Sequence, residues 1–123
     1  KSAVINYLHR ARRLGEDVNP ADLAASFQQA VVDVLVHKTV EAAVRYRAGT
    51  ILLAGGVAAN SHLRSCMTEA SAGYGFRLVY PPLLLCTDNA AMIACAAFYR
   101  YLRGDFSDLA LNAVPGLELG GDN

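Results

Sequence analysis

The chain has 123 residues, with 11 Lys and Arg against 11 Asp and Glu, and 54% of its residues are hydrophobic. This length allows at most one domain, and so high an apolar fraction excludes an intrinsically disordered protein. No apolar run approaches the roughly 20 residues of a membrane-spanning helix, so we expect no membrane contact. The three cysteines, at positions 66, 86 and 95, fit neither a disulfide framework nor a zinc ribbon, which favours a reducing, cytoplasmic location.

The first part of the chain predicts two helices. Apolar residues at three- and four-residue steps indicate an amphipathic helix over residues 2–14. Asn19 and Pro20 are typical of a helix start, and the long helix that follows is expected to end near residues 46–49, with Gly49 as the natural stop. Its apolar stripe is expected to consist of Leu23, Phe27, Ala30, Val31, Val34 and Leu35, with Ala42 and Val44 later.

The centre of the chain predicts a strand, a helix and a second strand. Residues 50–54 are apolar after Thr50, which suits a strand buried on both faces, and Gly55 and Gly56 close it. A helix capped by Asn60 or Ser61 follows, and residues 76–80 form the second strand. Such units are almost always right-handed parallel crossovers, so the two glycines are expected at the carboxyl edge of the sheet, where open α/β folds bind ligands.

The last part of the chain predicts one helix and an irregular tail. Thr87, Asp88 and Asn89 are expected to cap a helix that ends at Gly104. Residues 105–123 show no periodicity. Two strands cannot close an α/β core with four helices, so we expect at least one apolar face to be covered by chain outside this sequence.

The glycine pair and Asn60 are the first candidate site. Two glycines after a strand let a ligand approach the backbone, but they are equally typical of a tight turn that permits close packing. Asn60 can cap a helix, or it can present its amide to a ribose or a base. The residues alone leave these alternatives open.

Asp88 is the second candidate. A carboxylate at a helix start is either part of a cap or a hard-oxygen ligand for a cation, and alone it cannot hold a transition metal. His9, His37 and His62 are too widely spaced to form a paired metal motif. Among the cysteines, we expect Cys66 and Cys95 in the core and Cys86 exposed in a loop, and none of them is expected to be catalytic.

Three segments together resemble a known family. LLAGGVAANSHL at residues 52–63, the Pro81-Pro82 pair and LCTDNAAMIA at residues 85–94 resemble the C-terminal half of the TsaD family, also called Gcp and formerly labelled O-sialoglycoprotein endopeptidase. The resemblance extends back through residues 22–36 to Lys1. It implies that residues 1–104 are a C-terminal lobe fragment of a two-lobed α/β fold of the actin-like and sugar-kinase-like (ASKHA) type, with residues 105–123 as an irregular tail.

The same resemblance implies a function and site residues. Members of the family transfer threonylcarbamoyl from its adenylate to the adenosine next to the anticodon of tRNAs that read codons beginning with A. By position, Gly55, Gly56 and Asn60 match nucleotide- and substrate-contacting residues, and Asp88 matches a ligand of a divalent metal, iron by resemblance, with zinc or magnesium as alternatives. Implied partners are tRNA, threonylcarbamoyl-adenylate or ATP, and other proteins of the tRNA-modification complex, including a paralogous ASKHA subunit.

The family's paired-histidine metal motif has no counterpart in these residues. We therefore expect that this chain alone neither binds the metal tightly nor catalyses transfer, and that it self-associates through its uncovered apolar surface. Two arginine clusters, Arg10, Arg12 and Arg13 near the start and Arg45 with Arg47, are open candidates for tRNA contact, although a solvated helix face is the favoured explanation of the first.

Other classes of protein account for fewer of these residues. A small-molecule kinase of the same fold shares the glycine pair but gives no reason for the CTDNAAMIA segment. A non-catalytic scaffold paralogue fits less well, because Asn60 and Asp88 are both present. Peptidase activity, which the old family label suggests, has neither a nucleophile and base pair nor a complete metal site to support it.

Overall fold

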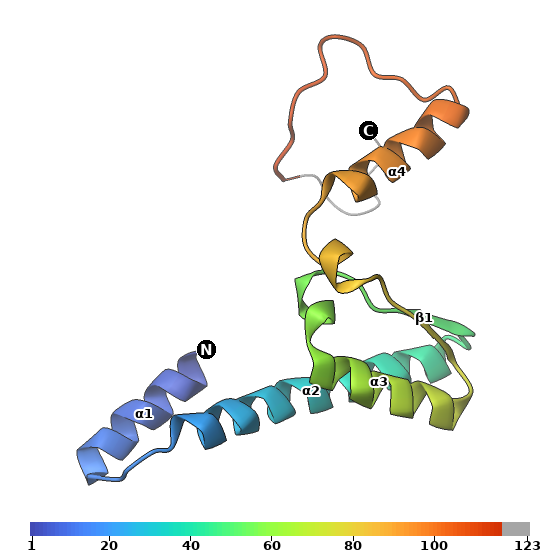
Figure 1. Cartoon of the computed structure of the whole chain (residues 1–123). Coiled ribbons are helices and arrows are strands. Elements are labelled where there is room, and N and C mark those ends of the chain that lie inside the picture. Colours follow the sequence, from blue (N-terminus) through green and yellow to red (C-terminus); the bar gives the residue numbers. More distant parts are fainter. Residues whose placement is uncertain (117–123) are drawn as a thin grey trace. The chain divides into compact units, whose positions relative to one another are not determined.

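A computed structural model of the chain describes residues 1–116 as a mixed α/β protein, which confirms the predicted fold class at this level (Figure 1). Contacts divide the chain into two units, Lys1–Thr87 and Asp88–Asn123, and each is described here by itself. Residues 117–123 of the predicted tail lie outside the described residues. The helices and strands are α1 (Ser2–Leu14), α2 (Pro20–Arg45), β1 (Thr50–Leu52), the short 3₁₀-helix η1 (Gly56–Ala59), α3 (Ser61–Tyr74), β2 (Arg77–Val79), the short 3₁₀-helix η2 (Leu83–Leu85) and α4 (Ala90–Leu102).

The two strands form the predicted parallel pair, with α3 as the connection between them. Ile51 is paired with Leu78 in the register of the sheet. The strands are shorter than predicted, and the prediction that the first is buried on both faces is wrong: Ile51 is buried, but Leu52 is 75% exposed. Within Lys1–Thr87, β1 has one buried residue between two exposed ones, and its apolar sequence cannot reveal that difference.

The core of the first unit joins α2 to α3. Asn19 caps α2 as predicted, because its side chain accepts a hydrogen bond of 3.0 Å from the Ala21 N–H. Val32 on α2 packs with Leu63 and Met67 on α3, and all three are buried. The residues packed around them are Val36, Leu53, Cys66 and Leu78.

The apolar stripe predicted for α2 is not its buried side. Its buried residues are Val32, Val40 and Ala43, whereas Phe27 and Val34 are exposed. Apolar residues lie on more than one side of this helix, so periodicity alone cannot select the side that meets α3 and the sheet.

The cap of α2, Tyr46, lies within the predicted stretch of residues 46–49, but the left-handed residue that follows it is not the predicted Gly49. The helix ends at Arg45, and Arg47 adopts a left-handed conformation with φ 53°. The Ala48 N–H then donates to the Ala43 carbonyl at 2.9 Å, which completes the hydrogen bonding that terminates a helix. A helix usually places glycine at the left-handed position, but here Arg47 takes it and Gly49 lies beyond.

The second unit contains α4, whose cap is Asn89: its side chain accepts from the Met92 N–H at 3.0 Å. Beyond the helix, Arg100 donates two hydrogen bonds to the Asp105 carboxylate, at 2.9 and 3.2 Å. The hydrogen bond from Arg100 lowers the pKa of Asp105, and the same pair raises the pKa of Arg100. Within residues 1–116, none of the helices combines the length and apolarity that crossing a lipid bilayer requires.

Candidate functional site

The glycine pair forms an open turn where β1 ends. Gly55 has φ 84° and ψ 174°, a conformation that residues with a side chain rarely adopt, and its carbonyl accepts from the Ala58 N–H at 3.0 Å. Gly56 begins η1, so this short helix separates the glycines from α3. A Cβ atom built on either glycine meets no atom within 4 Å. Close packing within the described residues therefore does not require these two glycines.

Asn60 joins two helices. Its Oδ1 accepts a hydrogen bond of 2.9 Å from the Leu63 N–H, which confirms the predicted cap of α3. Its Nδ2 donates to Oε1 of Gln28 on α2 at 2.9 Å. Sequence reasoning missed Gln28, because a polar residue 32 positions away gives no local signal of this contact.

A hollow of about 290 Å³ opens beside Asn60. Gln28 and Asn60 supply its polar groups, and the rest of its wall is apolar. Neither Gly55 nor Gly56 lines it. The apolar lining consists of Ala24, Phe27, Val31, Val32, Leu35, Val57 and Leu63.

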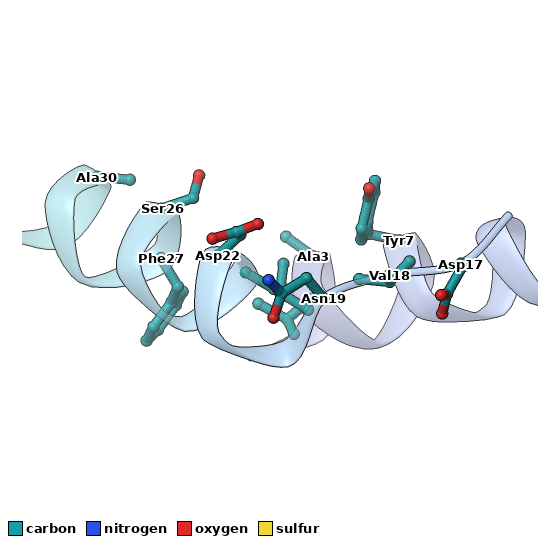
Figure 2. A pocket seen from close by; sticks show the side chains of 11 residues that line it. Ala3, Tyr7, Asp17, Val18, Asn19, Asp22, Ser26, Phe27 and Ala30 are labelled. Carbon is teal, nitrogen blue, oxygen red and sulfur yellow. The ribbon is translucent and has the colours of Figure 1, made fainter.

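A larger hollow, of about 620 Å³, lies between α1 and α2 and contains none of the predicted site residues (Figure 2). Its polar lining comes from Tyr7, Asp17, Asn19, Asp22 and Ser26. Figure 2 shows the Asp17 and Asp22 carboxylates at separate places along the two helices and their connection. The volume of a hollow therefore does not identify the glycine turn as a candidate site.

Asp88 is the first residue of the second unit, and its side chain is exposed. The residue that caps α4 is its neighbour Asn89. Across the part of the chain that the structure describes, no three His, Cys, Asp or Glu side chains gather closely enough to hold a metal ion. The Asp88 carboxylate fits the role of one hard-oxygen ligand, but the described residues do not complete a site around it.

Two of the cysteine predictions are wrong. Cys86, expected in an exposed loop, is only 3% exposed, and Cys95, expected in the core, is exposed. The Sγ atom of Cys86 lies 3.1 Å from a terminal nitrogen of Arg64 on α3 and also contacts the Pro82 carbonyl, at 3.5 Å. Cys66 lies against the core as predicted.

Comparison with known proteins places these features in a family. The profile of the TsaD family, described as tRNA N6-adenosine threonylcarbamoyltransferase, matches residues 1–95. A protein of that name from Moorella thermoacetica is 63% identical over 119 residues, which are 97% of this chain and 35% of the relative. Proteins of the same name from Desulfitobacterium hafniense and Geobacillus thermodenitrificans are each 59% identical, again across 97% of this chain and 35% of their own length.

The chain thus spans about a third of the length of the curated relatives it matches. The matched residues include the glycine turn, Asn60 and Asp88. Since the family profile covers more than three quarters of the sequence, the chain belongs to the TsaD family of tRNA N6-adenosine threonylcarbamoyltransferases.

Proposed function

We propose that this chain supplies the nucleotide-facing part of an enzyme that transfers threonylcarbamoyl from its adenylate to the exocyclic amine of the adenosine next to the tRNA anticodon. The relatives are named for threonylcarbamoyl transfer to tRNA adenosine, and this supports the proposal over a small-molecule kinase. Because the chain spans 35% of those relatives, the activity belongs to the whole protein, for which we propose the two-lobed ASKHA fold.

The observation that carries this proposal is the open glycine turn at the carboxyl edge of the parallel sheet. In α/β folds this edge is where ligands bind. A Cβ atom built on Gly55 or Gly56 would meet no other described atom within 4 Å, chain neighbours aside, and this supports the approach of a flat adenosine to the backbone.

Asn60 is suited to a second contact with the same ligand. An amide group has two N–H donors, and Gln28 accepts only one from Asn60. The other N–H can donate to a ribose hydroxyl or to a base while Oδ1 continues to cap α3. The cap and the substrate role are therefore compatible.

Asp88 would provide one oxygen ligand for a divalent cation, and the remaining ligands would come from chain beyond these residues. Such an ion, when bound, stabilises the negative charge that develops on a carbonyl or on a leaving phosphate. With a single ligand of its own, the 123-residue chain is expected to bind the metal weakly and not to catalyse transfer. Contact between tRNA and the arginines at positions 10, 12, 13, 45 and 47 belongs to the same proposal.

Gly56→Ala tests the turn. The new methyl group meets no neighbour, and Gly56 has an ordinary backbone conformation, so the fold should tolerate it. The methyl group would nevertheless stand where the adenosine approaches. In the complete gene product that contains this chain, we expect ATP affinity to fall about tenfold, which corresponds to roughly 1.4 kcal/mol.

The matched control is Gly73→Ala, on α3, where an added Cβ also meets nothing within 4 Å. This variant should bind ATP as the wild type does and gain stability, by up to about 1 kcal/mol, from the better helix propensity of alanine. Calorimetric titration with ATP and urea unfolding measure the two effects. Unchanged ATP affinity in Gly56→Ala would remove the glycine turn from the nucleotide site.

A further inference from the structure

Arg64 on α3 connects three segments of the first unit. Its Nε donates to the Ala58 carbonyl of η1. One terminal nitrogen donates to the Pro81 carbonyl at 2.9 Å and lies 3.1 Å from the Sγ of Cys86. The guanidinium group also lies over the ring of Tyr80, 4.4 Å from its centre. One side chain thus ties the loop after β1 to the loop after β2.

Two of the partners of Arg64 have little access to water, whereas Tyr80 is exposed. Ala58 is 1% exposed and Cys86 is 3% exposed, and Arg64 itself is half-buried. A guanidinium group is planar and carries donors in fixed directions, so it can hold two carbonyls at a set separation. A lysine carries one flexible ammonium and cannot reproduce that arrangement.

The two loops that Arg64 connects lie at the same edge of the sheet. In a parallel pair, the segments that follow β1 and β2 leave the sheet at the same edge. The first of these segments contains the glycine turn, whose Gly55 carbonyl is bonded to the Ala58 N–H. The second contains Pro81 and Cys86. Arg64 therefore sets the geometry of both sides of the edge at which we place the adenosine.

We propose that Arg64 is a positioning residue, which holds the glycine turn in the shape that binds the nucleotide and does not touch the nucleotide itself. This inference rests on the proposed function. Binding to a turn that is ordered in advance loses less conformational freedom, so removal of Arg64 should weaken affinity without removing any ligand contact.

The test compares Arg64→Met and Arg64→Lys with Arg77→Met, a control that removes one exposed arginine from β2 of the same unit. All are made in the complete gene product. Amide hydrogen exchange is followed at Ala58 and Asn60, whose N–H groups are bonded within the turn, and at Val40 in α2 as a reference for general unfolding. ATP affinity is measured at a temperature well below the unfolding transition of every variant.

In both Arg64 variants, we expect exchange at Ala58 and Asn60 to accelerate about tenfold or more while Val40 is unchanged. ATP affinity should fall about tenfold in Arg64→Met and remain reduced in Arg64→Lys, with no change in Arg77→Met. A general loss of stability would instead accelerate exchange at all three amides and leave ATP affinity of the folded protein intact.

Either unchanged exchange at Ala58 and Asn60, or unchanged ATP affinity in both Arg64 variants, would overturn the inference. A wild-type protein that bound no ATP would refute the proposed nucleotide site. Exchange at the two turn amides would then still decide whether Arg64 orders the turn, so the two failures can be told apart.

Discussion

At position 60, one amide side chain serves α2 and α3 at the same time. Its oxygen caps α3 through the Leu63 N–H, and its nitrogen donates to Gln28 across the interface between the helices. Removing the whole side chain would therefore mix loss of the cap, which costs about 1 kcal/mol, with loss of any contact to substrate. A substitution that keeps the oxygen and removes only the N–H donors separates the two.

Asn60→Asp is that substitution. Aspartate caps helices about as well as asparagine, and the Gln28 amide can turn to donate to it, so the free energy of unfolding should change by less than about 0.5 kcal/mol. ATP affinity should fall about tenfold, because an N–H donor is lost and a negative charge is placed near a phosphate-bearing ligand. Asn19→Asp, at the cap of α2, is the control and should leave ATP affinity unchanged. If Asn60→Asp binds ATP normally, Asn60 is a cap only.

Sequence reasoning succeeded for residues whose role is local. The caps Asn19, Asn60 and Asn89 all lie within three residues of the N–H that they bind, so the pattern predicts them. Gln28 and Cys86 were missed or misplaced because their surroundings depend on side chains 32 and 22 positions away. No local pattern carries that information.

Among the helices and strands, the end of α2 shows a conflict between local preference and the rest of the fold. Arg47 occupies the left-handed position that terminates the helix, although a side chain there costs roughly 1–2 kcal/mol relative to the right-handed region. The glycine that sequence reasoning assigned to this role is Gly49, two residues later, and it precedes β1.

Arg47→Gly should therefore stabilise the protein. The free energy gained by relieving the strained backbone exceeds the free energy lost because glycine has more conformational freedom in the unfolded chain. We expect the free energy of unfolding, measured with urea, to rise by about 0.5–1 kcal/mol. The converse control is Gly75→Ala at the left-handed cap of α3, where φ is 75°, and it should destabilise by about 1 kcal/mol. A destabilised Arg47→Gly would mean that the arginine side chain contributes more than its backbone costs.

The order and type of these elements followed from the sequence more closely than their buried faces did. Strand, helix and strand could be predicted because β1 is a short apolar run between turn signals and α3 carries its own cap. The buried side of α2 could not, because apolar residues surround that helix and only tertiary packing selects Val32, Val40 and Ala43.

The molecule as a whole leaves many large apolar side chains uncovered within the part that the structure describes. In the second unit, Ile93 is 65% exposed and Leu102 is 62% exposed, and no residue of α4 is buried. In the first, Leu84 is 85% exposed. The 123-residue chain is about a third of the length of its relatives, so cover for these side chains is expected from chain that the relatives possess beyond the matched region.

We therefore predict that the 123-residue chain self-associates when produced alone. Light scattering should report a mass that rises above 13.1 kDa as concentration increases. Ile93→Glu should lower this mass by placing a charge on the apolar surface of α4, and Asn112→Glu, which adds the same charge at an exposed position, should not. A mass that stayed at the monomer value at high concentration would contradict the prediction.

The central claim is that the complete gene product catalyses threonylcarbamoyl transfer and the 123-residue chain does not. Mass spectrometry of tRNA after incubation with threonine, bicarbonate and ATP tests it directly. The complete gene product, supplied with the proteins of its own modification complex, should form threonylcarbamoyladenosine next to the anticodon, and the 123-residue chain with the same additions should form none. Modified tRNA from the 123-residue chain with those additions, or no modified tRNA from the complete gene product with its partners, would contradict the account.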